Sequence, residues 1–403
     1  MSIVTIIIAS LLLLDVGWWF VADRVLQRAG WKAQARILHS FFFGLQLAGL
    51  AAVIASRRSE VWDRLPAVFT SAVYLWHLIV LPLLLPLSIA VGLVALLAWI
   101  IGKIRKGEAS HAIKPESDAI TRRAFLAATA AFTPQLFTVG LTAIALRQLE
   151  QFRVRRMTIP IRDLPAALNG LTIAHVSDIH AGRFTRGAIL REMTAAVNDL
   201  RSDLVLLTGD LINGALHELP EGIETVRRLD APSGVYMIEG NHDLFPGREA
   251  FESHVKRSGI PLLVNETAQL TVRDHPVQLL GQRWGGPIFR RRQGNDDGTI
   301  TAAFEELIAL RDPEAFPILL AHHPHAFDPA AAAGVPLTLA GHTHGGQLML
   351  NAETGFGPWM FRYWSGHYSR GDSHLVVSNG VGNWFPLRTR APAEIIHLTL
   401  QRV

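Results

Sequence analysis

The sequence predicts an α/β domain preceded by an all-α transmembrane region, and three observations lead to this prediction. Hydrophobic residues make up 49% of the 403 residues and charged residues only 18%, and the apolar character is concentrated in the first 146 residues. Beyond about residue 157, short apolar runs alternate with segments of helical spacing. Polar residues of the kind that bind metals follow five of these runs. We therefore expect a helical region at 1–150 and one folded domain at 157–403.

Four stretches of the first region are apolar enough to cross a bilayer, which takes about 20 helical residues. They are residues 3–22, 37–55, 66–101 and 124–146. The third is too long for one span and contains Pro82 and Pro86, so we interpret it as two spans that meet near the prolines. This gives four to five spans in all. Buried helices of a soluble protein fit poorly, because several uncharged stretches of this length rarely occur together.

Asp15 is the only charged residue within the first stretch. An ionisable residue inside a span is costly and is often functional or paired. The alternative is that Asp15 lies near the membrane interface beside Trp18 and Trp19.

The orientation in the membrane depends on the basic residues around the last span. Residues 102–123 carry the densest basic cluster near any span: Lys103, Arg105, Lys106, Lys114, Arg122 and Arg123. The positive-inside rule places this loop in the cytoplasm, which would deliver everything after about residue 147 to the outer face. Four arginines beyond the span count against this orientation: Arg147, Arg153, Arg155 and Arg156.

Composition also limits the classes of partner and ligand. The formal net charge is only +4, and the basic residues flank apolar segments instead of forming a stripe, so no nucleic-acid duplex is expected as a partner. The chain has no cysteine, which excludes disulfides and thiolate ligands. Any bound metal must therefore be held by His, Asp, Glu or Asn.

The second region alternates predicted strands and helices, which favours a layered α/β domain. Apolar runs typical of strands occur at residues 171–177, 203–208, 234–239, 261–264, 268–273, 276–280, 316–321, 336–340, 374–379 and 394–400. Helical spacing occurs at residues 186–200, 218–229, 248–258 and 300–310.

Metal-ligand side chains follow five of these predicted strands. The strand ends are Ser177-Asp178-Ile179-His180, Gly209-Asp210, Gly240-Asn241-His242-Asp243, His322-His323-Pro324 and Gly341-His342-Thr343-His344. In open α/β sheets, sites form beyond the carboxyl ends of the strands, so these side chains should converge. Carboxylates, imidazoles and an amide oxygen suit Mn, Fe, Zn or similar divalent ions. They are too many for one ion, which indicates two ions that share a carboxylate. Asp210 is the natural bridge because it is the lone acid of its motif.

The order D-x-H, G-D, G-N-H-D, H-x-P and G-H-T-H resembles that of the calcineurin-like metallophosphoesterase superfamily. The G-H-T-H-G-G-Q motif at 341–347 and the tail from Asn379 to Ile395 are similar to its membrane-associated bacterial branch of predicted phosphohydrolases. The resemblance covers roughly residues 157–403. It implies a four-layer αββα sandwich with a binuclear metal centre. Together with the apolar stretches, it leads us to expect an integral protein of a bacterial inner or plasma membrane, whose catalytic domain the positive-inside rule places outside the cytoplasm.

The resemblance also implies roles for nine residues. One ion would be held by Asp178, His180 and His344, the other by Asn241, His322 and His342, and Asp210 would bridge them. His242 would face the substrate and protonate the leaving oxygen, with Asp243 as the candidate that orients it. Two ions lower the pKa of a bridging water, so that hydroxide can attack phosphorus near neutral pH.

The sequence therefore predicts a membrane-anchored, metal-dependent phosphohydrolase that cleaves phosphate (di)ester or pyrophosphate bonds through a metal-bridging hydroxide. The anchor favours a lipid-linked or envelope-associated substrate, and no obligate protein partner is inferred. An alternative is a membrane transport or scaffold protein with an accessory or regulatory phosphoesterase domain. A metal-dependent amidohydrolase also has H-x-H motifs, but its motif order differs and Asn241 would be an unusual ligand.

Five further features have a structural and a functional interpretation. Residues 290–292 are three arginines that could meet a phosphate or a lipid head group, or face solvent in a loop. His323 and His325 are expected behind the ligands or facing solvent, and His175 is expected to be buried and hydrogen-bonded. His367 could touch substrate from the segment at 363–371.

Overall fold

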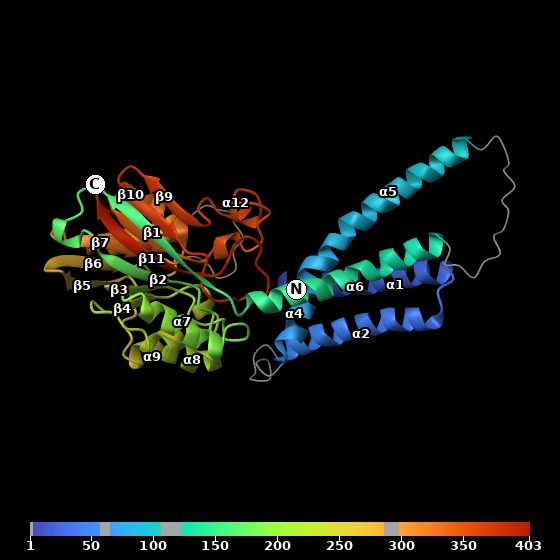
Figure 1. Ribbon diagram of the computed structural model, residues 1–403, viewed down its shortest axis with the longest axis horizontal. Coiled ribbons are helices and arrows are strands. Elements are labelled where there is room, and N and C mark those ends of the chain that lie inside the picture. The colour runs from blue at the N-terminus through green and yellow to red at the C-terminus, as the bar shows by residue number, and fades with distance from the viewer. Residues whose placement is uncertain (1–2, 57–64, 106–121, 286–297) are drawn as a thin grey trace. The chain divides into compact units, whose positions relative to one another are not determined.

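The computed structural model describes residues 3–56, 65–105, 122–285 and 298–403. These residues form two compact units, Met1–Leu146 and Arg147–Val403 (Figure 1). The first unit is entirely helical, and the second contains all the strands of the described residues. Residues 290–292 lie outside the described residues, as do residues 106–121 of the basic loop.

The first unit holds four helices long and apolar enough to cross a membrane, with candidate spans at Ile6–Arg28, Ala33–Ala55, Ala67–Lys103 and Ala124–Gln148. The helices are α1 (Ile3–Arg28), α2 (Ala33–Ser56), α4 (Ala67–Leu75), the π-helical turn η1 (Trp76–Val80), α5 (Leu81–Arg105) and α6 (Arg122–Gln148). Helices α4, η1 and α5 follow one another without a break and make one candidate span, Ala67–Lys103, so the division of 66–101 into two spans stays a prediction. The π turn ends two residues before Pro82, and Pro86 lies inside α5.

Asp15 is fully buried among these helices and is paired, as one of the two interpretations of its position in the sequence expects. The indole nitrogen of Trp76 in η1 donates a hydrogen bond of 2.7 Å to Asp15 Oδ1. His77 Nε2 lies 3.7 Å from Asp15 Oδ2. Asp15 therefore joins α1 to the π turn through a buried polar contact.

The second unit is built on two mixed sheets, one of five strands in the order β1-β11-β2-β3-β4 and one of six in the order β5-β6-β7-β8-β10-β9 (Figure 1). The first sheet contains β1 (Arg153–Ile161), β2 (Thr172–Val176), β3 (Leu204–Thr208), β4 (Val235–Ile238) and β11 (Glu394–Arg402). The second contains β5 (Glu266–Val272), β6 (His275–Gly281), β7 (Phe316–Leu320), β8 (Leu337–Ala340), β9 (Gly366–Arg370) and β10 (Ser373–Val377). Strands β2, β3 and β4 are parallel, as are β6, β7, β8 and β10.

Helices cover the outer face of each sheet. They are α7 (Ala188–Asp199), α8 (Leu219–Arg227) and α9 (Arg248–Arg257) on the first sheet, and α10 (Thr299–Ile308) and α11 (Phe327–Ala332) on the second. Strand β3 shows how the layers arise: Leu204 and Leu206 join the core between the sheets, while Val205 and Leu207 join the core under α7–α9. Alternating side chains of a strand point to opposite faces, so an all-apolar strand packs on both sides. The fold is thus the predicted αββα sandwich.

Shorter helices lie at the sheet edges. They are η2 (Ala166–Leu168), η3 (Leu216–Glu218), η4 (His242–Leu244), η5 (Pro324–Ala326), η6 (His344–Gly346) and α12 (Phe356–Met360). Two of these, η4 and η6, begin at predicted site residues.

The structure differs from the predicted strands in three places. Residues 261–264 form no strand and make only an isolated bridge, between Leu262 and Met237. Strands β1 and β9 were not predicted. In β1, Arg153 and Arg155 form ion pairs of 2.7 and 3.6 Å with Glu394, which is fully buried in β11. These arginines lie in a strand next to a buried carboxylate, which is why apolar alternation does not reveal β1 at its start.

Candidate metal centre

The predicted ligands follow the carboxyl ends of strands from both sheets. Asp178 follows β2, Asp210 follows β3 and Asn241 follows β4, while His322 follows β7 and His342 follows β8. Backbone hydrogen bonds join neighbouring loops: Asp178 N donates to Gly209 O at 3.0 Å, and Gly341 N donates to His322 O at 3.1 Å. The sheets therefore bring these five loops to one place, as their motif order predicts.

Five of the seven predicted ligands have a left-handed backbone. Their φ angles are 54° at Asp178, 47° at His180, 55° at Asp210, 71° at His342 and 49° at His344. Non-glycine residues rarely adopt this region, and each costs on the order of 1–3 kcal/mol. Strain gathered at one cluster in this way is typical of functional sites.

Two glycines let the strand-end loops approach one another closely. A Cβ on Gly341 would overlap Ser177 Oγ and Asp178 Oδ2, and a Cβ on Gly240 would overlap Asp210 Oδ1. Only glycine leaves room for these carboxylates. The two glycines therefore set the position of Asp178 and Asp210.

The first group of side chains brings together Asp178, His180 and His344. The Nε2 atoms of His180 and His344 are 3.0 Å apart. Asp178 Oδ1 lies 3.3 Å from His344 Nε2 and 3.9 Å from His180 Nε2. All three residues are buried.

The second group brings together Asp210, His322 and His342. Asn241 joins it, since its Oδ1 lies 3.2 Å from His322 Nε2. Asp210 Oδ2 is 3.2 Å from His322 Nε2 and also 3.5 Å from His180 Nε2. One carboxylate oxygen thus touches both groups, which is the geometry that a bridging ligand requires.

The donor set fits divalent metal ions. Ligand atoms at about 2.0–2.2 Å from an ion stand roughly 3–3.6 Å from one another. Here two imidazole nitrogens are 3.0 Å apart, and the nitrogen-to-carboxylate distances run from 3.2 to 3.9 Å. Imidazole, carboxylate and amide oxygen without thiolate suit Mn, Fe or Zn. His322 Nδ1 lies 2.6 Å from Thr208 O, a contact that leaves Nε2 free to bind a metal.

The electrostatics of the cluster also favour a cation. Burial lowers the pKa of His180, His342 and His344 well below its ordinary value, which keeps the imidazoles in the neutral form that binds metals. Burial works against charge on His322 as well, but the nearby carboxylates of Asp210 and Asp178 raise the pKa of His322 to about 9. The two carboxylates therefore favour a positive charge at this place, and without a metal ion that charge is a proton on His322.

His242 stands beside the first group without being enclosed by it. Its ring centroid lies 4.6 Å from that of His180 and 4.5 Å from that of Phe245. Its Nδ1 lies 2.9 Å from Asn213 O, which leaves Nε2 free. Its side chain also lies close enough to His180 and Asp210 to be counted with them as a candidate ligand group.

Asp243 does not contact the His242 ring in the structure. Its carboxylate is fully buried and accepts hydrogen bonds from Ile212 N at 3.0 Å and Gly240 N at 2.9 Å. The contact to His242 Nδ1 comes instead from Asn213 O. Asp243 therefore holds the loop that carries Asn241 and His242, and Asn213 takes the orienting position expected of Asp243.

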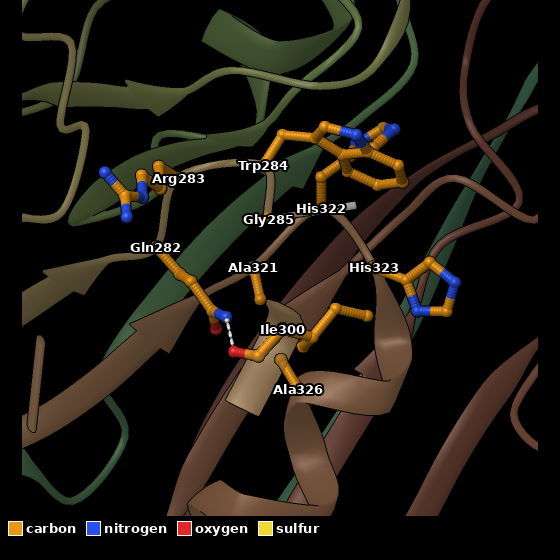
Figure 2. A pocket seen from close by; sticks show the side chains of 9 residues that line it. All are labelled: Gln282, Arg283, Trp284, Gly285, Ile300, Ala321, His322, His323 and Ala326. Carbon is orange, nitrogen blue, oxygen red and sulfur yellow. Dashed lines mark hydrogen bonds between the residues drawn. The ribbon is translucent and has the colours of Figure 1, made fainter. Parts of the chain in front are cut away.

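Trp284 forms a wall beside the second group and was not singled out by the sequence. Its ring centroid lies 5.5 Å from that of His322 and 5.1 Å from that of His342. Trp284 N donates to Glu239 Oε1 at 3.0 Å, and Arg248 donates to Trp284 O at 3.1 Å. A small pocket opens here (Figure 2), lined by Gln282, Arg283, Trp284, Gly285, Ile300, Ala321, His322, His323 and Ala326.

Arg388 is a second residue whose contact with the site sequence reasoning missed. Its guanidinium is buried and lies 3.0 Å from His344 Nδ1, and it donates to Asn379 O at 2.7 Å and Gly382 O at 2.5 Å. Burial lowers the pKa of Arg388 to about 10, so it remains charged at neutral pH. Its only sequence signal is its place in the tail shared with the family.

The remaining histidines largely follow the structural interpretation. His175 is fully buried with Nε2 at 2.8 Å from Thr208 Oγ1. His325 is buried, and its backbone N donates to His323 Nδ1 at 3.2 Å. His367 pairs with His374 across β9 and β10, at 2.9 Å, and no contact places it at the metal centre.

Comparison with known proteins relates most of the second unit to a known family. The family model for calcineurin-like phosphoesterases matches residues 171–346, a range that includes all nine predicted site residues. An archaeal phosphodiesterase of known structure is 12% identical, covers 52% of this chain and 84% of its own, and superposes with a TM-score of 0.28, which is too low to support an inference.

Two relatives have the same type of domain. A transmembrane protein with metallophosphoesterase domain from Danio rerio is 29% identical over 272 residues, which cover 62% of this chain but only 57% of the relative. An uncharacterized metallophosphoesterase, YkuE, from Bacillus subtilis (strain 168) is 29% identical over 257 residues, covering 60% of this chain and 84% of the relative. The four apolar helices and the transmembrane relative support membrane association. Residues 171–346 of the second unit match the calcineurin-like phosphoesterase family, and the unit as a whole is similar to metallophosphoesterases.

Proposed function

We propose that the chain is a membrane-anchored phosphoesterase with two divalent ions, which hydrolyses phosphate (di)ester or pyrophosphate bonds. Asp178, His180 and His344 would hold one ion, and Asn241, His322 and His342 the other. The observation that carries the proposal is the position of Asp210 Oδ2, within 3.5 Å of His180 Nε2 and 3.2 Å of His322 Nε2. When bound, the ions would lower the pKa of water and neutralise the phosphoryl oxygens.

The side chains themselves position the reaction. Asp210 keeps the two groups together, and Asp243 fixes the 240–243 loop through the backbone amides of Ile212 and Gly240. Trp284 packs beside His322 and His342 of the second group. Each of these contacts reduces the motion of the ligands, which is how a protein pre-organises a charged transition state.

His242 is the general acid of this proposal. Asn213 O accepts from Nδ1, so Nε2 would carry the proton that passes to the leaving oxygen when the ring is charged. Imidazole suits this role because its ordinary pKa is near neutral pH. Its place at the edge of the first group, beside the partly exposed Trp384 at a ring distance of 6.2 Å, leaves it accessible to a substrate.

The substrate is proposed to be lipid-linked or associated with the envelope, because the domain is tethered by apolar helices. The catalytic domain is proposed to face away from the cytoplasm, in a bacterial inner or plasma membrane. The chain has no cysteine, so a single Leu310→Cys variant can test sidedness with a membrane-impermeant maleimide. Labelling in intact spheroplasts supports this orientation, and labelling only after lysis contradicts it.

The enzymatic proposal is tested with the full chain in detergent, stripped of metal and reloaded with Mn, Fe or Zn. We expect release of nitrophenol from nitrophenyl esters only after reloading, and about two ions per chain by elemental analysis. Asp210→Asn should lose metal and reduce turnover by about a thousandfold, since a metal contributes several kcal/mol. Asp372→Asn, an exposed aspartate on a weak surface pair, is the matched control.

Metal-independent turnover, or an Asp210→Asn variant with full metal content and activity, would contradict the two-ion centre. A wild-type protein that binds two ions but cleaves neither mono- nor bis-esters would favour the alternative, a transport or scaffold protein with a regulatory phosphoesterase domain.

A further inference from the structure

Four large apolar side chains are exposed close together on a short segment of the second unit. They are Leu350, 76% exposed, Phe356, 49%, Trp359, 64%, and Met360, 40%, and we call them the apolar rim. Leu350 lies in a turn closed by a hydrogen bond of 2.8 Å to Thr354 O, and the rings of Phe356 and Trp359 are 5.8 Å apart. Exposed apolar side chains that cluster in this way mark interaction sites.

The apolar rim lies at the edge of the metal centre. Helix α12, which carries three of its residues, packs against η6, which begins at His344. The approach is so close that a Cβ on Gly346 would lie 2.6 Å from the backbone of Gly357. Whatever covers the rim is therefore near the proposed ligand His344.

The rim is also joined to the residue at which α6 ends. Met349 N donates to Thr389 O at 3.0 Å, and Thr389 N donates to Gln347 O at 2.9 Å. The preceding residue, Arg388, donates from its backbone N to Gln148 Oε1 at 3.0 Å. Gln148 is the last residue of α6 and of its candidate span. One loop thus contacts both the rim segment and the point where the chain leaves the span.

Two arginines accompany this arrangement. Arg147 precedes Gln148 and Arg390 follows Thr389, and both are exposed. Neither has an ion-pair partner among the described residues. Basic residues beside exposed Trp, Phe and Leu are the composition of surfaces that bind anionic lipid.

We propose that the apolar rim docks on the surface of the bilayer that holds the chain's own helices. Trp359 and Phe356 would enter the boundary between head groups and acyl chains, where aromatic side chains are favoured. The hydrogen bonds to Gln148 and Thr389 tether the rim segment to the end of the candidate span. A second copy is a poorer occupant, because four side chains fall well short of the roughly 800 Å² that each partner buries in a stable interface.

Docking gives the proposed phosphoesterase a substrate class. With the rim in the bilayer, the edge of the metal centre at His344 would face the membrane surface, and the substrate would be an amphiphile whose phosphoester group projects from the lipid. This second step depends on the proposed function, whereas docking itself does not depend on catalysis.

Single-cysteine variants of the full chain, reconstituted in phosphatidylcholine–phosphatidylglycerol vesicles, test the docking. The variants are Trp359→Cys on the rim and Leu310→Cys as the control, since Leu310 is an exposed apolar residue, 54%, at the end of α10. Each carries an environment-sensitive fluorophore. We expect lipids with an acyl-chain nitroxide to quench the label at 359 and not at 310.

Equal or absent quenching at both positions would overturn the docking. If the fluorescence at 359 is not quenched by the nitroxide but changes when the protein is diluted in the bilayer, a second copy covers the rim. That result would also overturn the docking on lipid.

An activity measurement separates this inference from the proposed function. A variant with Leu350→Glu and Trp359→Glu should raise KM about ten- to a hundredfold for a long-chain alkyl nitrophenyl phosphodiester in vesicles, because two apolar contacts are lost. It should leave turnover of soluble bis-nitrophenyl phosphate unchanged. If the label at 359 is quenched but no variant turns over either ester, the docking is supported and the proposed phosphoesterase activity is contradicted. An unchanged KM for the long-chain ester would reject the substrate class.

Discussion

Both units of this protein bury ionisable side chains, but they do so in different ways. In the helical unit, Asp15 has one strong donor, Trp76, and its Oδ2 faces His77 Nε2 at 3.7 Å with no hydrogen bond. In the sandwich unit, carboxylates and imidazoles from five loops converge within hydrogen-bonding distance of one another. The helical contact joins two helices, whereas the sandwich cluster has the side chains to bind a cation.

The difference also appears in the backbone. The residues around Asp15 lie in regular helix or in one π turn, while five of the seven proposed ligands are left-handed. A fold accepts such strain only where the surrounding structure holds it in place. The first cluster therefore has the geometry of a stabilising contact, and the second has that of a candidate functional site. The predictions below test this contrast.

The largest effect is expected at His242. His242→Ala should lower turnover of an alkyl phosphoester by about 10²–10⁴, the usual contribution of a general acid. A nitrophenyl ester should lose much less, because nitrophenolate leaves without a proton. Metal content should stay unchanged in elemental analysis. The control is His254→Ala, an exposed histidine on α9. Equal losses for the two esters, or loss of one ion, would show that His242 binds metal instead.

The close approach of the loops predicts the next effect. Gly341→Ala should displace Asp178, because the added Cβ would overlap its Oδ2 and Ser177 Oγ. Misplacing a reacting group by about 1 Å can cost a hundredfold in rate, so we expect a loss of about that size with weaker metal binding. Gly140→Ala in α6 is the matched change in the helical unit, where nothing lies within 4 Å. If both variants keep full activity, the tight packing around Asp178 is not needed.

A smaller effect is expected for the buried contact in the helices. Trp76→Phe removes the donor to Asp15 and leaves a buried carboxylate oxygen without a partner, which costs about 1–3 kcal/mol. Unfolding of the helical unit in mixed micelles measures this loss, and phosphoesterase activity should not change. The double variant Asp15→Leu, Trp76→Phe should recover most of the stability, because replacing both partners is nearly neutral. Additive losses would mean that the hydrogen bond contributes nothing.

The two clusters also differ in how far the sequence alone could predict them. The proposed ligands were visible because each follows a strand, and parallel strands bring their carboxyl ends together. Trp76 is 61 positions from Asp15, and nothing in the spacing of apolar residues indicates which helices pack together. Asp15 could therefore be noticed but not paired.

Other features of the metal centre were beyond sequence reasoning for the same reason. Trp284 and Arg388 reach the site across the fold, and their neighbours in sequence carry no ligand motif. The family resemblance implied Asp243 as the residue that orients His242, yet Asn213 from another loop makes the contact. Adjacent residues need not face each other, and only the folded chain shows which distant ones do.

The smallest expected effect concerns His175, which is buried near the cluster without belonging to it. Burial lowers the pKa of His175 to about 3, so the folded state keeps it neutral while the unfolded chain binds a proton below about pH 6.5. The unfolded state then holds more protons, and stability falls as the pH drops from about 6.5 towards 3. At pH 5.5 the loss of folding free energy amounts to about 1.4 kcal/mol.

The melting temperature of the sandwich unit, followed by proteolysis at pH 7.5 and 5.5, should therefore drop less in His175→Gln than in the wild type. Because the comparison uses the change with pH, any loss from the substitution itself cancels. Equal drops would mean that His175 is protonated in the folded protein, and that burial beside Thr208 Oγ1 does not exclude charge from this strand.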